Sequence, residues 1–435
     1  MNAPMNDPEE FITIDVDQLR VGLYISLDLG WMDHPFLSNS FKISAAGQIN
    51  TIKRLGLKQV RYHPAKSSNQ PLSRATAPST TEAAPTAEPE PEINQEEQAA
   101  MAAKKARIEH LKRHRQSVIK CEKALFEAVG TIKNINKNLF SRPKECVEAA
   151  VGLVGQMVSS LLTDKDVAIH VMNDKLAGED VYLHPLNVSI LAMILAKEMG
   201  LSRQEVHLAG LGAVFHDIGK TKIPDIILRK TEALTKPEQN FLMQHPVYGE
   251  EIGQQLELAA PVLDIIRHHH EQMDGNGYPD KLKEPKLSKL ARIVAIVNAF
   301  DNLCNHVNPL KSVTPHEAIS FMFAKQKNQL DQEAMSVFIR SMGVYPPGTV
   351  VRLSNEMWGS VAAVNVKRPL RPTVIVYDAS VPKEEPIIID LEDEPGLSIS
   401  KTFRPAQLPR EVFDYLSPRT RITYYFDEAA DGLNH

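Results

Sequence analysis

A long stretch without large apolar side chains divides this chain into parts that fold separately. Residues 64–98 consist largely of Thr, Ala, Pro, Glu and other small or polar residues. A segment of this kind cannot bury enough surface to offset the conformational entropy that it loses on ordering. We therefore predict a disordered linker over residues 64–98, with folded domains on both sides of it.

The part of the chain before the linker is short and mixes strand and helix patterns. Residues 11–16 alternate between apolar and polar side chains as a strand does, and residues 21–27 and 58–62 have the composition of strands. Residues 48–55 predict a short helix. We expect a small α+β domain over residues 11–63, with a regulatory role.

After the linker the pattern becomes helical. Residues 99–142 predict a helical connector, in which charged residues are followed by an apolar stripe from Val118 onward. A signalling or dimerising helix, as in a homodimer, and a helix packed on its own domain both fit this stripe. Residues 143–345 contain successive apolar helical patterns that fit no βαβ arrangement. Residues 346–435 contain short runs of β-branched residues between Gly, Pro and Asn. The predicted fold class is therefore mainly α: an all-helical domain between a small α+β domain and a small β-rich region.

The composition excludes several classes of function. The 435-residue chain has a formal net charge of −5, which gives no general electrostatic reason to bind a nucleic acid polymer. Its three cysteines include no CxxC pair, so we expect neither a disulfide framework nor a zinc ribbon. The N-terminus has no signal-peptide pattern, and no apolar run reaches the ~20 residues of a membrane span. We expect a cytoplasmic protein without a membrane partner.

Imidazoles and carboxylates are dense in the predicted helical domain. His216 and Asp217 are adjacent at the predicted end of one helix, and His269 and His270 repeat that adjacency at the end of another. A lone buried His is more often a packed residue than a ligand, but a cluster of this density predicts a polynuclear metal site. Neutral imidazole suits Fe, Mn, Zn or Ni, and a carboxylate can bridge two cations. Asp217 is the candidate for the bridge.

A further histidine, His245, follows a clear helix start. Thr235 is a capping residue with Pro237 in the first turn and Glu238 three residues after the cap. We therefore predict that the helix starting at Thr235 carries His245.

The ligand types indicate phosphoester chemistry. Two cations a few ångströms apart can bind the non-bridging oxygens of a phosphodiester and acidify a shared water molecule. Lys220 lies one turn past Asp217, where it can contact a phosphate oxygen or compensate the C-terminal end of a helix dipole. The turn-rich loop that follows the histidines can be purely structural, or a lid or partner surface, and its key residues are Gly275, Gly277, Tyr278 and Pro279.

These residues together resemble the signature of the HD-GYP family, a branch of the HD phosphohydrolases. The resemblance covers roughly residues 145–345, and residues 11–63 resemble the small domain that often precedes it in bacterial proteins. It implies an α-helical HD domain with two or three divalent metal ions, Fe or Mn in the first place and Ni or Zn as alternatives. It also implies hydrolysis of cyclic di-GMP to pGpG and GMP. The positions that match metal ligands are Asp180, His184, His216, Asp217, His245, His269 and His270.

By the same resemblance, Asp217 and Lys220 are catalytic and Lys220 contacts the substrate phosphate. The Gly-Tyr-Pro loop is implicated in contacts with diguanylate cyclase (GGDEF) domains. Two positions depart from the family pattern. Asn298 occupies the position of the last Asp ligand, with Asp301 three residues on, and Lys311 is the nearest cation where the family has an Arg-x-Tyr segment. The leading hypothesis is a metal-dependent cyclic di-GMP phosphodiesterase. The alternatives are a cyclic di-GMP sensor or adaptor of low or absent activity, and a hydrolase of another nucleotide.

Overall fold

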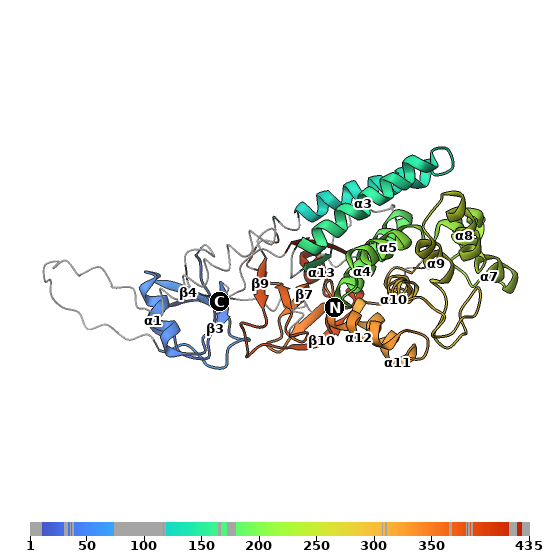
Figure 1. The fold of residues 1–435 in the computed structure, drawn as a ribbon. Helices are drawn as coiled ribbons and strands as arrows, with labels where there is room; N and C mark the ends of the chain where they lie inside the picture. The colour runs from blue at the N-terminus through green and yellow to red at the C-terminus, as the bar shows by residue number, and fades with distance from the viewer. Residues whose placement is uncertain are drawn as a thin grey trace, which may run out of the picture. The chain divides into compact units, whose positions relative to one another are not determined.

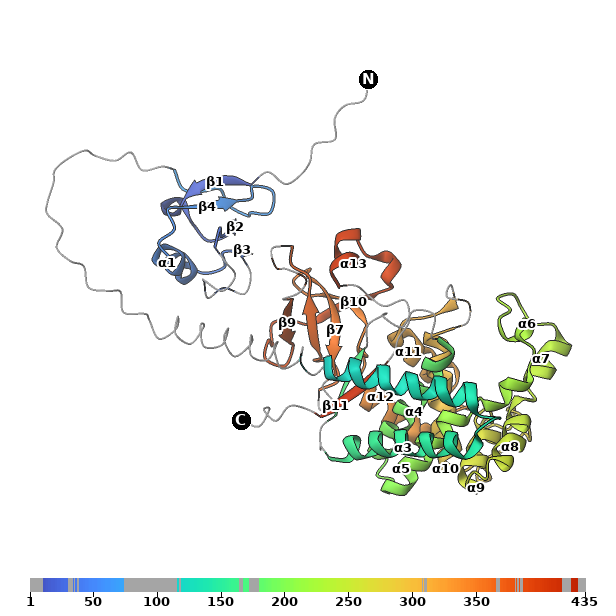
Figure 2. The same cartoon turned by 90° about the horizontal axis from the view of Figure 1, so that it is seen from above.

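The computed structural model describes most of the chain. The described residues are 11–29, 34, 36, 39–73, 116, 119–163, 167–171, 180–306, 308, 311–364, 368–379, 381, 383, 386–416 and 424–428. Their contacts divide the chain into two compact units (Figures 1 and 2). Each unit is described by itself.

The N-terminal unit contains a four-stranded antiparallel sheet in the order β1-β4-β2-β3. Its strands are β1 (Ile12–Asp15), β2 (Tyr24–Ser26), β3 (Ser40–Lys42) and β4 (Gln59–Tyr62), and its helix is α1 (Ala46–Arg54). Ile52 of α1 packs with Leu23 and Ile25 in the core of this unit. The mixed α+β character predicted for this part of the chain is therefore present.

The chain stays on this unit beyond residue 63. The backbone N–H of Ser68 donates to the carbonyl of Gly22 over 2.9 Å, and that of Leu72 donates to Gln18 over 2.9 Å. These contacts belong to the first residues of the segment predicted as a linker. Residues 74–98, the rest of that segment, lie outside the described residues.

The second unit is mainly helical. Its helices are α3 (Pro143–Thr163), α4 (Asp180–Glu198), α5 (Arg203–Phe215), α6 (Asp225–Leu228), α7 (Lys236–Leu242), α8 (His245–Gln255), α9 (Ala260–His268), α10 (Lys289–Cys304), α11 (Pro315–Lys325) and α12 (Gln332–Met342). Residues 185–196 of α4 are buried on all sides, as expected for a central helix that is apolar around its whole circumference. Helices α5 and α10 pack directly against α4.

The predicted helical connector contributes to the same core. Of its residues, 119–138 are helical, and those before 116 lie outside the described residues. Leu125, Val129 and Ile132 are buried in the cluster that also contains the α4 side chains. The apolar stripe therefore faces the core of its own unit, which is the second of the two alternatives that its pattern left open.

Local sequence signals set several helix ends. Thr235 caps α7, and Glu238 completes the predicted capping box. The prediction that this helix carries His245 is wrong, because α7 ends at Leu242 and α8 begins at His245. Pro246 accounts for the break, since it has no N–H to donate and is tolerated only in the first turn of a helix.

The C-terminal region is rich in strands, as predicted. A five-stranded sheet has the order β10-β6-β7-β8-β9. Its strands are β6 (Val350–Leu353), β7 (Trp358–Ala363), β8 (Thr373–Val376), β9 (Ile387–Asp390) and β10 (Ile399–Phe403), and helix α13 (Arg410–Leu416) follows.

A two-stranded sheet was not expected from the sequence. Strand β5 (Val167–Val171) lies between α3 and α4 and pairs antiparallel with β11 (Tyr424–Glu428), so the predicted all-helical segment contains one strand. The partner strand lies near the opposite end of the sequence. A local reading of periodicity does not detect such a pairing.

One helix in the described part of the chain, α3, is long and apolar enough to cross a membrane by length and composition alone. A stripe of this helix that includes Val154, Val158 and Leu161 is buried in the core of the helical unit. The three cysteines are buried free thiols, in line with the absence of a disulfide framework.

Candidate metal centre

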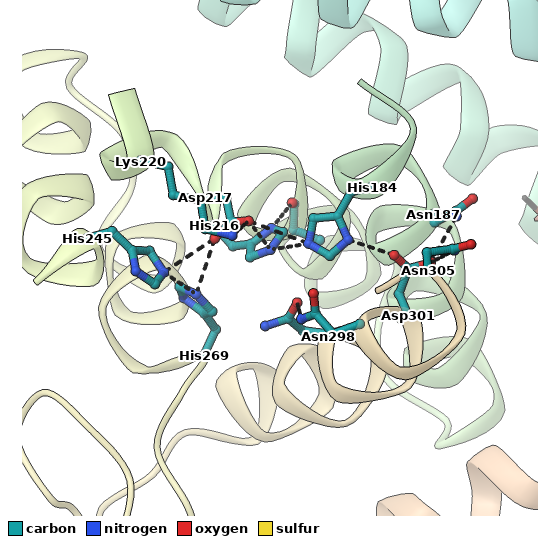
Figure 3. A network of polar contacts seen from close by, with 12 residues as sticks. His184, Asn187, His216, Asp217, Lys220, His245, His269, Asn298, Asp301 and Asn305 are labelled. Atoms are coloured by element: carbon teal, nitrogen blue, oxygen red, sulfur yellow. Dashed lines mark hydrogen bonds and ion pairs between the residues drawn. The ribbon is translucent and has the colours of Figure 1, made fainter. Parts of the chain in front are cut away.

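Two groups of potential metal ligands share one carboxylate (Figure 3). On one side, the Nε2 atoms of His184 and His216 are 3.2 Å apart and lie 3.5 and 3.4 Å from Asp217 Oδ2. On the other side, the Nε2 atoms of His245 and His269 are 3.3 Å apart and lie 3.3 and 3.8 Å from Asp217 Oδ1. His270 belongs to this second group, in which all ligand atoms lie within 4.8 Å of one another. The structure thus brings these six predicted residues together.

Helix ends orient three of the imidazoles. The Nδ1–H groups of His216, His245 and His269 donate to carbonyls three residues earlier, over 2.7, 2.7 and 2.8 Å respectively. The carbonyls in the last turn of a helix have no intrahelical partner, so they are free to accept such bonds. With the proton on Nδ1, each Nε2 lone pair faces the cluster, as metal coordination requires.

His184 is oriented by a carboxylate instead of a carbonyl. Its Nδ1 lies 2.6 Å from Oδ2 of Asp301, which comes from α10 and is 1% exposed. Asp301 lies three residues after Asn298, the position at which the HD-GYP pattern has its last Asp ligand. The structure places it behind His184, where its contact directs the opposite nitrogen of the ring, Nε2, toward Asp217.

A glycine allows Asp217 to approach His245. Asp217 precedes a short 3-10 helix, Ile218–Lys222, that packs against α8. A Cβ atom on Gly219 would lie 1.9 Å from the carbonyl oxygen of His245 and 2.4 Å from the backbone nitrogen of Gly249. Only a residue without a side chain fits at this contact, so the sequence Asp217-Ile218-Gly219 sets the distance across the cluster.

The protonation of the cluster suits cation binding. Burial lowers the pKa of His216 to about 4, and burial also holds the pKa values of His269 and His270 well below their usual range. Burial alone would raise the pKa of Asp217, but the neighbouring His216 and Lys220 outweigh it and hold that pKa well below its usual range. Neutral imidazoles around an ionised carboxylate are the protonation states that metal ligation needs.

His184 differs from the other histidines of the cluster. Burial lowers its pKa, but hydrogen bonds to Asp217 and Asp301 outweigh burial and raise the pKa to about 9. The ring lies between two carboxylates, which favour its protonated, positively charged form. A bound cation would neutralise the same carboxylates in place of this proton.

One buried atom shows that a divalent metal fits. Asp217 Oδ1 is buried and has no hydrogen-bond partner among the described residues, although two imidazole nitrogens face it. A buried carboxylate oxygen without a partner is costly. A divalent cation among these donors removes that cost, and the combination of imidazole and carboxylate suits first-row transition metals.

Lys220 and Asn298 have defined partners in the structure. Lys220 Nζ forms an ion pair with Asp217 Oδ2 over 2.5 Å. Asn298 is 3% exposed and lies on the side of α10 that faces the imidazoles (Figure 3). Its Oδ1 accepts a hydrogen bond from Asn302 Nδ2 over 2.7 Å. Among the described side chains, the carboxylates near His184 are Asp217 and, behind the ring, Asp301.

The structure leaves the side chain of one further predicted residue undescribed and shows no contact between another and the cluster. Asp180 is the first residue of α4, but its side chain lies outside the described residues. Lys311 is exposed, and its backbone N–H donates to the carbonyl of Asn308 over 2.9 Å. Among the contacts of the described residues, none joins Lys311 to the histidines.

The Gly-Tyr-Pro loop folds against the cluster. Gly275 has a φ of +79°, which favours glycine. A Cβ atom on Gly277 would lie 2.4 Å from the backbone nitrogen of Gln272, so the backbone approaches closely there. The Tyr278 ring stacks on His270, with centroids 4.7 Å apart and planes at 17°. The tyrosine thus supports a potential ligand, and Asn276 is the exposed residue of the loop.

Sequence reasoning missed two residues that hold the site together. Glu271 is 4% exposed and accepts hydrogen bonds from the backbone N–H groups of Asp280 (2.6 Å) and Leu282 (3.0 Å), which closes the Gly-Tyr-Pro loop. Asn187 is 1% exposed and donates to Asp301 Oδ1 over 2.9 Å. The sequence signal for Asn187 was its place one turn after His184, in a stretch of α4 that is mostly apolar.

Comparisons with known proteins identify two family domains in this chain. An HD domain family model matches residues 156–334, and a domain of unknown function (DUF3391) matches residues 11–150. The cyclic di-GMP phosphodiesterase PA4108 of Pseudomonas aeruginosa is 28% identical over 370 residues, which cover 84% of each protein. The cyclic di-GMP phosphodiesterase response regulator RpfG of Xanthomonas campestris is 35% identical over 156 residues, which cover 35% of this chain and 41% of that protein. A solved HDG"Y"P protein, Bd1817 of Bdellovibrio bacteriovorus, covers 76% of this chain and 98% of its own, with 16% identity and a TM-score of 0.40.

Proposed function

Because this chain belongs to the HD-GYP family, we propose that it is a metal-dependent phosphodiesterase that hydrolyses cyclic di-GMP to pGpG and then to GMP. The observation that carries the proposal is the pair of ligand groups that share Asp217, with two imidazoles on one side and three on the other. The P. aeruginosa relative, which is named for cyclic di-GMP hydrolysis, is similar over most of both chains and supports the substrate.

The residues of the cluster would hold two metal ions. His184 and His216 would hold one divalent ion, His245, His269 and His270 a second, and Asp217 would bridge the two. Fe or Mn fits these donors best, with Ni or Zn as alternatives. Two bound divalent ions would attract the phosphate oxygens and acidify a water molecule.

Lys220 would contact the substrate phosphate. It pairs with Asp217 Oδ2, the oxygen that faces His184 and His216. With a cation held at that oxygen, the ammonium would lie within reach of the same place and would hold a phosphate oxygen as a point charge. Tyr278 keeps His270 in place by stacking on it. We also propose that the loop contacts a diguanylate cyclase domain, that the chain forms a homodimer and that Lys311 contributes to substrate binding.

The direct test is hydrolysis by the full chain purified anaerobically with Mn or Fe. We expect cyclic di-GMP to be converted to pGpG and GMP, and the activity to disappear when a chelator removes the metal. Products are followed by chromatography, and metal is counted per chain. A metal-loaded protein that leaves cyclic di-GMP intact contradicts the proposal. Cyclic GMP-AMP (3′3′-cGAMP) serves as the comparison substrate, because metal ligands do not specify the bases.

One observation favours a second candidate, a sensor that binds cyclic di-GMP without hydrolysing it. The buried Asn298 amide faces the imidazoles but carries no charge, and its oxygen already accepts a hydrogen bond from Asn302. An ion on the His184 side would therefore be held by less negative charge than a carboxylate at position 298 would provide.

The substitution Asn298→Asp decides between enzyme and sensor. We expect it to tighten the weaker of two metal sites about tenfold or more, because a carboxylate attracts a dication more strongly than an amide does. Asn355→Asp, in the exposed turn between β6 and β7, adds the same charge elsewhere and serves as the control. The sensor is favoured if only Asn298→Asp hydrolyses cyclic di-GMP. Equal metal affinity in both variants would show that position 298 takes no part in the site.

A further inference from the structure

A chain of buried hydrogen bonds joins the C-terminal strand to the metal cluster. The backbone N–H of Tyr424 in β11 donates to Asn187 Oδ1 over 3.2 Å, and Asn187 Nδ2 donates to Asp301 Oδ1 over 2.9 Å. Asp301 Oδ2 lies 2.6 Å from His184 Nδ1, and the other nitrogen of that ring faces Asp217 (Figure 3). The links come from α4, α10 and β11, which are far apart in the sequence.

This chain of hydrogen bonds is shielded from water, and its donors and acceptors fit in only one direction. Asn187 and Asp301 are each 1% exposed, and Tyr424 is 0% exposed. Rotating the Asn187 amide by half a turn would set its NH₂ group against the Tyr424 N–H and its oxygen against the Asp301 carboxylate. The Tyr424 ring also stacks on Phe300, with centroids 6.2 Å apart and planes at 28°, which fixes the strand beside Asp301.

The orientation of Asp301 follows from its donors. Its Oδ1 accepts from both Asn187 and Asn305, each over 2.9 Å. Oδ2 is thereby directed toward His184 Nδ1. A carboxylate behind a ligating histidine selects the ring tautomer and orientation, and loss of such an outer partner typically costs about 10–100-fold in metal affinity.

We propose that Asn187 is a positioning residue for His184, and that docking of β11 completes the His184 half of the metal centre. The inference rests on the metal centre of the proposed function and adds a dependence of that centre on the C-terminal strand. Asn187 touches neither substrate nor metal in this scheme. It acts through Asp301, so the effect belongs to one half of the centre and not to the half formed by His245, His269 and His270.

The test is titration of the metal-free full chain with Mn²⁺. Wild type is expected to bind two ions, and their spin coupling is visible by electron paramagnetic resonance. In Asn187→Ala we expect one ion to bind about tenfold more weakly and the other unchanged, so that the signal of a single isolated ion appears at intermediate Mn²⁺. Ser189→Ala is the matched control, because Ser189 is buried on the same helix and donates to the carbonyl of Gly210 over 2.9 Å. It should bind both ions as wild type does.

A second variant covers the case in which Asn187→Ala does not fold. Asn187→Leu keeps the volume of the side chain but has no group that can donate to Asp301, so the same selective weakening is expected. If every folded Asn187 variant binds both ions with wild-type affinity, the positioning role is overturned while the metal centre stands. If wild type itself binds fewer than two ions, both the inference and the two-metal form of the proposed function fail.

Thermodynamic reciprocity gives an independent readout at the strand. If docking of β11 strengthens metal binding at His184, metal binding must stabilise β11 by the same factor. Hydrogen exchange of a peptide that contains Tyr424 should therefore slow by up to about tenfold when Mn²⁺ is added to wild type. No change is expected in Asn187→Ala. Equal exchange with and without metal in wild type would overturn the coupling.

Discussion

Replacing Asp217 by Ala is expected to abolish cyclic di-GMP hydrolysis and to prevent binding of a metal pair. Asp217 is the carboxylate that both ligand groups share, so its removal takes one ligand from each side of the centre. It also leaves Lys220 without its ion-pair partner beside the imidazoles, which adds unfavourable charge where cations would bind. The measurement is metal content per chain after anaerobic loading, followed by chromatography of the reaction products.

Two further variants make the Asp217 result specific. Asp225→Ala makes the same chemical change at an exposed carboxylate that pairs with Arg229, and it should retain metal and activity. Asp217→Asn keeps the shape of the side chain and removes only its charge, so it separates loss of ligation from loss of packing. Hydrolysis at the wild-type rate in either Asp217 variant would rule out the shared-carboxylate site.

Gly219→Ala is expected to destabilise the helical unit by about 3 kcal/mol and to impair the metal centre although no ligand is altered. The new Cβ atom would lie 1.9 Å from the carbonyl oxygen of His245, a backbone atom that cannot rotate away. The 3-10 helix after Asp217 must therefore move away from α8, which separates Asp217 from His245. Urea unfolding with and without metal measures the stability, and metal counting measures the centre.

The control for Gly219 is a helical glycine with free space around it. Gly152 lies in α3, and a Cβ atom built on it meets nothing within 4 Å. Gly152→Ala should raise the stability by about 0.5–1 kcal/mol, because Ala has the higher helix propensity. The opposite signs at two glycines of one unit test the close-contact argument. A Gly219→Ala variant as stable and as metal-rich as wild type would refute it.

The histidines show most clearly which features the sequence predicts and which need the structure. Their recurrence next to helix ends predicted a cluster, and the structure brings His216, His245 and His269 together with Asp217. The signal is local, because a residue at a helix end finds free carbonyls three residues earlier that orient its ring. The capping box at Thr235 was predictable for the same reason. The break at His245 was missed, although Pro246 was its local cause.

Sequence by itself therefore determined the helical class, the position of the histidine cluster and the use of glycines in the Gly-Tyr-Pro loop, because these depend on neighbours within a few residues. Tertiary structure alone decided the pairing of β5 with β11, the contact of Asn187 with Tyr424 and the place of Asp301 behind His184. These contacts join segments that are far apart in the sequence. Hydrophobic periodicity depends on neighbouring residues, so it does not predict them. Only the packing of α4, α10 and the C-terminal strand selects one partner for each buried polar group, since an unpaired one would be costly.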